Sequence, residues 1–257
     1  MHAPDFSLKN KLALITGSTQ GLGYAIACAY AASGATVIIN GRDAERVDRA
    51  VTSIHNAGYP AHGWTQDIGS LDDQASAFAS LVKQVGVPDI LVNNVGIRIR
   101  KSLAVSSFDD ITTMIQVNLV AAIGLSKLAA QAMADRRPAG GRIISLTSIA
   151  GPLARPGDAV YPVAKLGLQG LVHSLAVEFG PYGITSNGIA PGTFATESNR
   201  ELANDPVKGP VVVGRNPLGR WAQPDEITGA AVFLASPCAS YVNGHTLVVD
   251  GGFSVTF

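Results

Sequence analysis

The chain has 257 residues, of which 47% are hydrophobic and only 15% are charged, a composition that supplies a large core and excludes a disordered protein. Its 19 basic and 19 acidic residues cancel, so the basic excess typical of nucleic-acid-binding proteins is absent. No apolar run is long enough to span a bilayer, and the N-terminus lacks an apolar signal segment. We therefore expect a cytoplasmic protein without a nucleic-acid or membrane partner. The two distant cysteines, Cys28 and Cys238, indicate buried thiols and no metal site.

Short apolar segments alternate with segments of helical length. The apolar segments, most of them continuous as in strands buried on both faces, are residues 12–16, 36–40, 61–65, 90–93, 142–147, 184–189 and 246–249. Helices are expected at residues 24–32, 44–57, 71–85, 108–136 and 161–179. This alternation predicts an α/β fold: one Rossmann-like, doubly wound parallel sheet with helices on both faces, in a single domain of residues 1–257. Residues 194–217 lack clear periodicity, and we expect them to form a mobile substrate flap.

The first predicted strand runs into the sequence TGSTQGLG, residues 16–23. Gly17 can leave the strand with an unusual backbone φ, Gly21 can let a phosphate reach the N–H groups at the helix start, and Gly23 permits close packing. A tight turn would explain the same glycines equally well. By itself this motif is therefore a weak indication of a dinucleotide site.

The second strand ends in the sequence VIINGRD, residues 37–43. Dinucleotide-binding folds often place an acid here to bind the ribose hydroxyls, whereas this chain has Gly41 followed by Arg42. A guanidinium can pair with a 2′-phosphate, which favours NADP(H), with NAD(H) as the alternative. Arg42 could also be an ordinary solvated side chain, and Asp43 is expected to cap the next helix.

Reacting groups are concentrated in the sequence SLTSIAGPLARPGDAVYPVAK, residues 145–165. Tyr161 and Lys165 lie four residues apart and share one helix face, and Pro162 places Tyr161 in the first turn. A nearby ammonium favours the phenolate and so lowers the pKa of a tyrosine. The hydroxyl of Ser148, just after a strand, could donate to a carbonyl oxygen or accept from an alcohol. An exposed Tyr–Lys pair without a catalytic role is the alternative.

In their order and spacing, these segments resemble the short-chain dehydrogenase/reductase family over essentially the whole chain. The matching pieces are TGSTQGLG, QDI (66–68), NNVG (93–96), VNL (117–119), Ser148, YPVAK (161–165) and IAPGTFATE (189–197). The resemblance implies hydride transfer between a nicotinamide and an alcohol or ketone carbon of a small-molecule substrate. It also implies a homotetramer. Val95 replaces the usual alanine, and Gln20 stands where NADP-dependent relatives often have a basic residue, which leaves Arg42 as the main 2′-phosphate candidate.

The resemblance further implies a role for each matching residue. Tyr161 would be the general acid/base, Ser148 would orient the substrate oxygen, and Asn118 would anchor a water in a proton relay. Lys165 would lower the pKa of Tyr161 and hold the nicotinamide ribose. The cofactor would contact three groups of residues: the glycine loop, the adenosine side and the nicotinamide side, namely Gly17, Ser18, Thr19, Gln20, Gly21, Leu22 and Gly23; Asn40, Arg42, Asp67, Ile68 and Asn94; and Gly96, Tyr161, Lys165, Pro191, Gly192, Thr193 and Thr196.

Within the family, the chain is most similar to gluconate 5-dehydrogenases, in segments such as INGRDAE, NNVGIRIR, LARPG and GRWAQPDEITGAAVFL. That similarity implies a sugar acid, gluconate or its 5-keto form, as the substrate. Arg98 and Arg100 could meet its carboxylate and Trp221 could wall the pocket, although a solvated basic patch and a structural tryptophan fit as well. The segment SIAGPLARPG is less polar than expected for that group. A 3-oxoacyl-thioester or other carbonyl reductase of the same family is the alternative, and a non-catalytic nucleotide sensor is a remote one.

Overall fold

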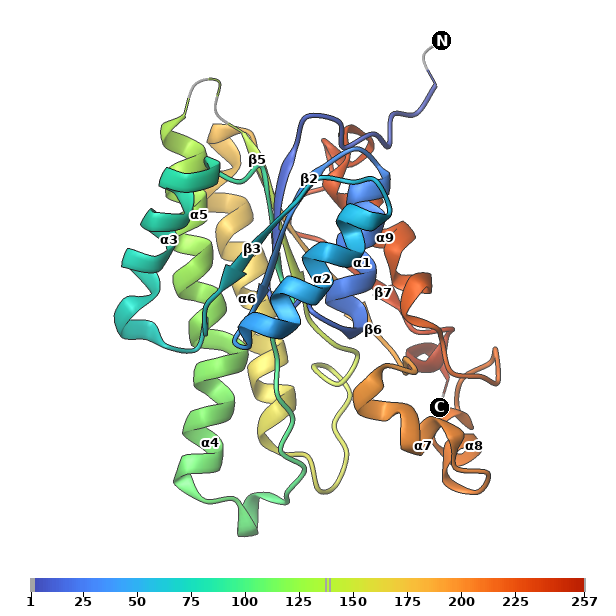
Figure 1. Cartoon of the computed structure of the whole chain (residues 1–257). Helices are drawn as coiled ribbons and strands as arrows, with labels where there is room; N and C mark the ends of the chain where they lie inside the picture. The colour runs from blue at the N-terminus through green and yellow to red at the C-terminus, as the bar shows by residue number, and fades with distance from the viewer. Residues whose placement is uncertain (1–2, 137, 139, 257) are drawn as a thin grey trace.

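The structure, a computed structural model, describes residues 3–136, 138 and 140–256 (Figure 1). Seven strands form one parallel sheet in the order β3-β2-β1-β4-β5-β6-β7. The strands are β1 (Leu12–Ile15), β2 (Thr36–Gly41), β3 (Ala61–Thr65), β4 (Ile90–Asn93), β5 (Gly141–Leu146), β6 (Ile184–Pro191) and β7 (Thr246–Val249). The expected α/β fold is confirmed, and each observed strand lies within two residues of its prediction.

Helices cover both faces of the sheet (Figure 1). One face carries α1 (Gly21–Ala32), α2 (Ala44–Asn56) and α9 (Thr228–Ala235), and the other carries α3 (Leu71–Val85), α5 (Ala121–Asp135) and α6 (Val160–Phe179). From β1 the chain winds outward through β2 and β3, then returns to place β4 on the other side of β1. The loops that follow β1 and β4 therefore leave the sheet in opposite directions, which opens a crevice at the carboxyl edge.

The long helix predicted at 108–136 is divided into three parts. A π-helical turn, Gln116–Val120, separates α4 (Phe108–Ile115) from α5. By length and composition, the stretch Phe108–Asp135 could cross a membrane, since its most apolar window has a mean hydropathy of 1.4. From the sequence, no run long enough to do so was expected. The stretch packs against β4, β5 and α6, but only 33% of that window is buried, so much of its apolar surface faces outward.

The segment expected to be aperiodic, residues 194–217, contains two short helices, α7 (Arg200–Asn204) and α8 (Lys208–Val213). Its base is closed by an isolated parallel bridge between Phe194 and Ala222. The Ala222 N–H donates to the Thr193 carbonyl at 3.0 Å. Both ends of the segment are therefore joined beside the carboxyl end of β6. The sequence did not predict α7 and α8, because helices of five and six residues are too short to show a helical period.

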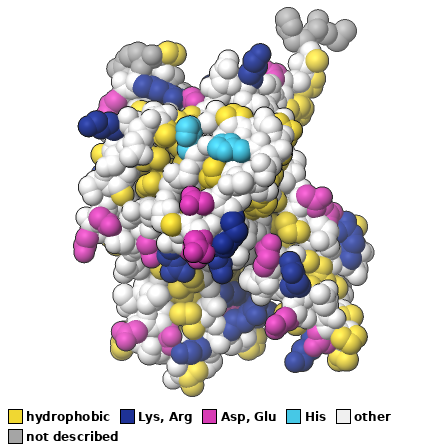
Figure 2. Space-filling model, viewed as in Figure 1, with side chains coloured by type: hydrophobic (Ala, Val, Ile, Leu, Met, Phe, Trp, Pro, Cys, Tyr) yellow, Lys and Arg dark blue, Asp and Glu magenta, His cyan; other side chains and the backbone are white. Residues whose placement is uncertain are grey.

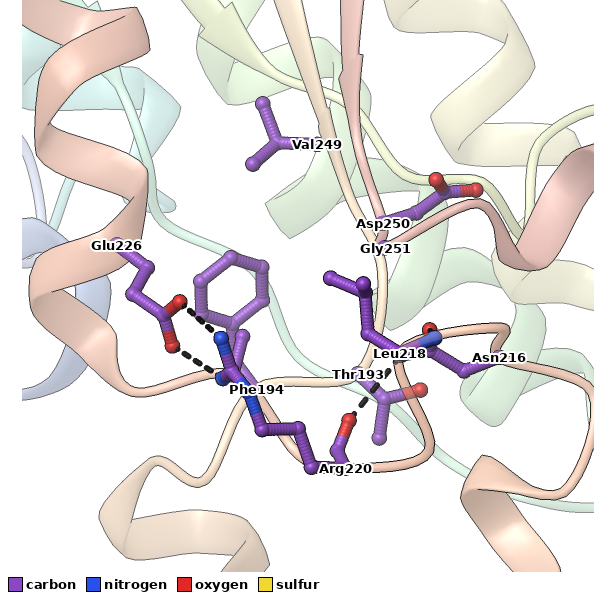
Figure 3. Close-up of a pocket in the computed structure, with 10 residues that line it drawn as sticks. Thr193, Phe194, Asn216, Leu218, Arg220, Glu226, Val249, Asp250 and Gly251 are labelled. Atoms are coloured by element: carbon purple, nitrogen blue, oxygen red, sulfur yellow. Dashed lines mark hydrogen bonds and ion pairs between the residues drawn. The ribbon is translucent and has the colours of Figure 1, made fainter.

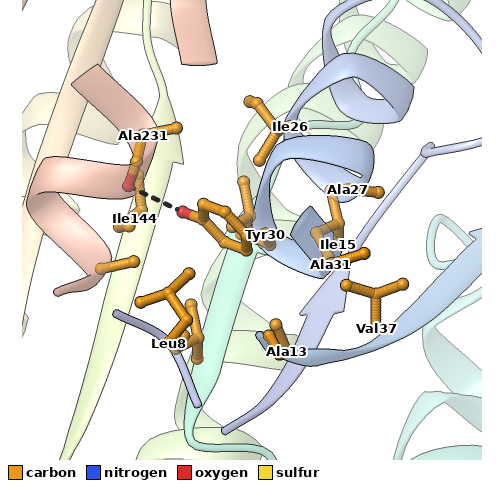
Figure 4. Packing of buried hydrophobic residues seen from close by; sticks show 14 of the residues in the cluster. Leu8, Ala13, Ile15, Ile26, Ala27, Tyr30, Ala31, Val37, Ile144 and Ala231 are labelled. Atoms are coloured by element: carbon orange, nitrogen blue, oxygen red, sulfur yellow. Dashed lines mark hydrogen bonds between the residues drawn. The ribbon is translucent and has the colours of Figure 1, made fainter. Parts of the chain in front are cut away.

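Tyr30 joins α1 to α9 inside the larger hydrophobic cluster (Figure 4). Its ring is fully buried beside Leu8 and Ile144, and its hydroxyl donates to the Ala231 carbonyl at 3.0 Å. Burial raises the pKa of this phenol far above its usual value, so it serves only as a neutral donor. The hydrogen bond satisfies the one polar atom that the ring carries into the core.

Replacing Tyr30 with Phe should lower the free energy of unfolding by about 1 kcal/mol, because a buried hydrogen bond is lost while the packing is kept. Chemical denaturation of the purified protein measures this change. Tyr59→Phe is the matched control, since Tyr59 is 38% exposed. Equal stability of the two variants would show that the bond to Ala231 contributes nothing.

Candidate active site

The glycine loop between β1 and α1 has a backbone that only glycine adopts easily. Gly17 and Gly21 both have φ of +60°, in the left-handed region. A Cβ at Gly17 would stand 2.9 Å from Val95 Cγ2, and one at Gly23 would stand 2.4 Å from Asn94 Nδ2. The sequence predicted that Gly23 permits close helix–strand packing. In the structure, the close contact that it permits is with the Asn94 side chain.

The N-terminus of α1 is open to a ligand. Its N-cap, Gln20, makes no side-chain capping hydrogen bond, and its first turn contains no acidic residue. The unpaired N–H groups and the positive end of the helix dipole suit phosphate oxygens. The segment after β6 faces this helix start: the position that a Cβ of Gly21 would take lies 3.5 Å from Glu197 Oε2 and 3.7 Å from Thr196 Cγ2. The glycine loop and the segment after β6 therefore approach each other at the edge of the crevice.

Three residues predicted to touch the cofactor are inside the protein. Ser18 is fully buried, donates from Oγ to the Ile15 carbonyl at 2.7 Å, and accepts the Asn40 N–H at 3.0 Å. Asn40 is 1% exposed; its Oδ1 accepts the Gly17 N–H, and its Nδ2 donates to two carbonyls at and just after the end of β3. The Ile68 side chain is 3% exposed, in the second core cluster. These side chains support the loop from within.

Asn94, directly after β4, ties that loop to the one after β1. Its Nδ2 donates to the carbonyls of Thr16 and Gly17, at 2.9 and 3.0 Å. The Thr16 hydroxyl in turn accepts the Asn94 and Val95 N–H groups. These bonds hold the two walls of the crevice in one geometry.

At the adenosine end, Arg42 lies at the carboxyl end of β2, with Nη1 3.8 Å from Asp67 Oδ2. Sequence reasoning missed a second guanidinium there. Arg46 is in the first turn of α2, which Asp43 caps as predicted, and its Nη1 donates to Gln20 Oε1 at 3.4 Å. Arg46 lines an open pocket of about 390 Å³ beside the glycine loop, together with Thr19, Gln20, Tyr24, Arg49, Ala50 and Ser53. Lys and Arg side chains are prominent in the middle of this face in Figure 2.

Pro191 is the last residue of β6, and Gly192 and Thr193 follow it directly. The Ile149 N–H donates to the Pro191 carbonyl at 3.3 Å, which joins the end of β6 to the loop that carries Ser148. A Cβ at Gly192 would stand 2.7 Å from Asp250 Cα, so only glycine fits this close approach to the residue after β7.

Beside Thr193 lies a pocket of about 140 Å³ (Figure 3). Thr193 and Phe194 line it together with Asn216, Leu218, Arg220, Ala222, Glu226, Val249, Asp250 and Gly251. Arg220 makes two hydrogen bonds of 2.7 Å to Glu226 and, with help from the Gln223 N–H, lowers the pKa of Glu226 to about 2. Trp221, predicted as a wall of the substrate pocket, donates from Nε1 to the Gly209 carbonyl at 3.1 Å, which ties it to the segment 194–217; its contact with substrate stays a prediction.

The reacting groups meet at the carboxyl ends of β4 and β5. Helix α6 begins at Val160, so Tyr161 lies in its first turn, as Pro162 predicted. The Lys165 ammonium is buried, donates to the Leu146 carbonyl at 2.7 Å, and lies 5.7 Å from the Tyr161 ring centroid. The Ser148 side chain hydrogen-bonds with Tyr161.

Asn118 reaches the same place from the π-helical turn, a feature often found at functional sites. Its Oδ1 accepts the Ile97 N–H at 2.7 Å, and its Nδ2 donates to the Ile97 carbonyl at 2.9 Å. A Cβ at Gly96 would stand 2.9 Å from Asn118 Oδ1 and 3.4 Å from Lys165 Nζ. Four predicted groups from three separate segments thus converge: the π-helical turn, the loop after β5 and α6.

The electrostatics of the site differ from the sequence expectation. Burial raises the pKa of Tyr161, and the largest opposing influence is the Arg98 guanidinium, not the Lys165 ammonium. The hydrogen bond with Ser148 and the charge of Arg100 also lower the pKa of Tyr161, whereas Asp158 raises it. Burial, assisted by Arg98, lowers the pKa of Lys165 to about 8.

Two further charged residues, Asp158 and Arg155, were missed in the sequence. Asp158 is buried and binds the Arg98 guanidinium, while Arg155 Nε lies 3.5 Å from the same carboxylate oxygen. A lone acid three residues before Tyr161 in an apolar stretch was the available signal. Arg100 makes no hydrogen bond or ion pair with any residue in the described part of the chain. Within those same residues, no cluster of His, Cys, Asp and Glu could hold a metal ion.

Comparison with known proteins agrees with this architecture. Residues 17–254 match a family model described as enoyl-(acyl carrier protein) reductase. The chain is 37% identical to gluconate 5-dehydrogenase of Gluconobacter oxydans, over all of both chains. It is 36% identical to 5-keto-D-gluconate 5-reductase of Escherichia coli K12, over 97% of this chain and 98% of that one.

A solved structure shares the whole fold. The gluconate 5-dehydrogenase of Burkholderia cenocepacia, in complex with NADP and tartrate, superposes with a TM-score of 0.94 at 37% identity, covering 99% of each chain. Full-length similarity of this kind, on a sheet of the same topology, establishes the family. This protein belongs to the short-chain dehydrogenase/reductase family of NAD(P)-dependent oxidoreductases.

Proposed function

We propose that this oxidoreductase uses NADP(H) to interconvert a hydroxyl and a keto group on a sugar acid such as gluconate. The observation that carries the proposal is the positive charge beside Tyr161. The guanidiniums of Arg98, Arg100 and Arg155 carry three positive charges, and the Asp158 carboxylate offsets one of them. A surplus of cations next to the reacting phenol suits an anionic substrate.

Arg100 and Arg155 are the better candidates for the substrate carboxylate. Two donors of Arg98 are already bound to Asp158, whereas Arg100 has no hydrogen-bonding partner among the described residues. Burial and the nearby charges of Arg98 and Arg155 lower the pKa of Arg100, so an added anion there would relieve both effects. The names of the relatives from Gluconobacter oxydans and Escherichia coli support the same substrate class.

In the proposed reaction, Tyr161 accepts the hydroxyl proton during oxidation and donates it back during reduction. Ser148 hydrogen-bonds with the reacting oxygen and fixes its position beside Tyr161. The nicotinamide, when bound, accepts or supplies the hydride. Lys165, which is anchored on the Leu146 carbonyl, keeps donors free for the ribose hydroxyls. Asn118 holds the loop after β4 through Ile97, and its position suits a role in proton relay.

We further propose that the protein works as a cytoplasmic homotetramer. The support is a set of exposed apolar side chains on the outer surfaces of α4, the π-helical turn, α5 and α6: Phe108, Val120, Ile123, Val163, Leu166 and Val177. Apolar surface of this extent favours association between copies of the chain.

Tyr161→Phe should reduce turnover of D-gluconate and of its 5-keto form by at least about a hundredfold, because the proton donor is removed. Steady-state assays with NADP⁺ and NADPH measure this, and fluorescence titration should show that NADPH still binds. Tyr182→Phe, on an exposed tyrosine after α6, is the control. Near-normal turnover by Tyr161→Phe would exclude the assigned mechanism. If the unsubstituted protein reduced a 3-oxoacyl thioester but neither sugar acid, the substrate would be a thioester instead.

Cofactor preference should depend on both Arg42 and Arg46. Each charge-assisted contact to the 2′-phosphate is worth roughly 1.5–3 kcal/mol, so each alanine variant should weaken NADPH binding roughly tenfold or more. NADH binding should change little, because NADH lacks this phosphate. Parallel titrations with both cofactors measure the difference, with Lys83→Ala as a distant control. Equal weakening of NADPH and NADH would contradict the assignment.

Arg100→Ala should raise KM for D-gluconate roughly tenfold or more, because a charge-assisted hydrogen bond to the carboxylate is lost. A neutral polyol of similar length should be affected far less. Lys101→Ala is the control, since Lys101 lies next in the loop but is paired with Asp110 at 2.7 Å. A similar effect on acid and neutral substrate would remove Arg100 from carboxylate recognition.

A further inference from the structure

A buried ion pair beside Tyr161 is not explained by hydride transfer itself. Asp158 is 1% exposed, and its Oδ2 accepts hydrogen bonds from both Nε and Nη2 of Arg98, the former at 2.8 Å. Its other oxygen, Oδ1, is buried and has no hydrogen-bond partner among the described residues. A carboxylate in this environment is costly unless a cation compensates it, so its presence calls for a role.

Arg98 connects this pair to the reacting phenol. Its guanidinium carbon lies 4.5 Å from the centroid of the Tyr161 ring, whereas the Lys165 ammonium lies 5.7 Å away. A guanidinium so close to a ring face is attracted to the neutral phenol, and it is attracted more strongly to the phenolate. The loop after β4 carries Arg98, and the loop before α6 carries Asp158, so the pair also joins the two segments that flank the site.

Charged and titratable groups approach Tyr161 from every side of its surroundings. Lys165 comes from α6 itself, Arg98 and Arg100 come from the loop after β4, and Asp158 comes from the loop before α6. Ser148 contributes a neutral hydroxyl from the loop after β5. Among the influences that oppose the burial of Tyr161, that of Arg98 is the largest.

We propose that Arg98 and Asp158 are positioning residues: the buried Asp158 carboxylate holds the Arg98 guanidinium against the face of Tyr161, where its charge stabilises the phenolate that accepts the substrate proton. The inference rests on the proposed role of Tyr161 as general acid/base. It assigns to Arg98 the stabilisation of the Tyr161 phenolate, a role that the family resemblance had implied for Lys165. It also separates Arg98 from Arg100, since Arg98 serves the phenol and Arg100 remains for the substrate.

The primary test needs no substrate. Ultraviolet absorbance titration of the protein minus that of its Tyr161→Phe variant isolates the ionisation of Tyr161. In an Arg98→Gln background, the same difference titration should give a pKa higher by about one unit, because a cation 4.5 Å from the centroid of the Tyr161 ring has been removed. Lys101→Gln, which removes a cation from the same loop but from an ion pair with Asp110, should leave the pKa unchanged. An unchanged pKa in Arg98→Gln overturns the proposal.

The role of Asp158 is tested by the same titration in two backgrounds. With Arg98 replaced by Gln, Asp158→Asn removes only a negative charge, so the pKa of Tyr161 should fall. With Arg98 present, Asp158→Asn also releases the guanidinium, so this fall should be cancelled or reversed. Equal downward shifts in both backgrounds would mean that Asp158 does not hold Arg98 in place, and the positioning role would be excluded.

Kinetics then connect the ionisation to the reaction. The acidic limb of kcat/KM for oxidation of D-gluconate should move to higher pH in Arg98→Gln by the same amount as the titration, so the rate on that limb falls about tenfold per unit. KM at high pH should be unchanged. A raised KM with an unmoved limb would make Arg98 a carboxylate ligand instead.

Stability controls accompany every variant. Arg98→Gln leaves Asp158 buried without its main cation and is expected to be less stable, whereas the double variant Arg98→Gln/Asp158→Asn removes both charges with little change in shape. If the single variant does not fold, the double variant still tests the proposal: its Tyr161 pKa should lie above that of the unsubstituted protein, though by less than in Arg98→Gln, because Arg98 lowers this pKa more than Asp158 raises it. Loss of turnover in Tyr161→Phe together with an unmoved titration in the double variant would reject this inference and leave the proposed function intact.

Discussion

The reversal of strand order between β1 and β4 is the constraint on which the rest of the structure depends. Because every strand is parallel, all carboxyl ends lie along one edge, and the loops there must carry any ligand site. Asn94 locks this edge by donating to the carbonyls of Thr16 and Gly17 across the two central strands. The glycine loop, the π-helical turn and the start of α6 then lie around one crevice, although they are far apart along the chain.

Inside that crevice, burial and charge oppose each other. Tyr161 and Lys165 are both removed from water, which by itself favours the neutral phenol and the neutral amine. Arg98 and Arg100 act against burial at Tyr161, because they favour the phenolate, whereas Arg98 acts in the same direction as burial at Lys165, because it disfavours a second cation. A poorly solvated site strengthens such interactions. Arg98 occupies a special place in this balance, because it lowers the pKa of both groups and is itself held by a buried carboxylate.

Local chemistry explains why part of the site was predictable. Gly17 has a positive φ, as its place after a buried strand suggested, and Asp43 caps α2 as its position predicted. Tyr161 lies in the first turn of α6, where Pro162 required it to be. In contrast, Ser18 in the glycine loop and Asn40 in β2 were expected to touch the cofactor, but both are buried and hydrogen-bond to each other. The direction of these side chains depends on how the loop packs on β2, which no period reveals.

The alternating strands and helices, the glycine turn, the helix that presents Tyr161 and Lys165, and the family could all be read from the amino-acid pattern. These features depend on backbone preference, on hydrophobic period and on short spacing, all of which are local. In contrast, three contacts emerge only from the folded chain: Arg98 binds Asp158, Arg46 lies beside the glycine loop with Arg42, and Trp221 hydrogen-bonds to the segment 194–217. Arg98 and Asp158 are sixty residues apart and meet only because β4 and β5 are adjacent in the sheet. Pairing between distant side chains depends on strand order, which no local pattern encodes.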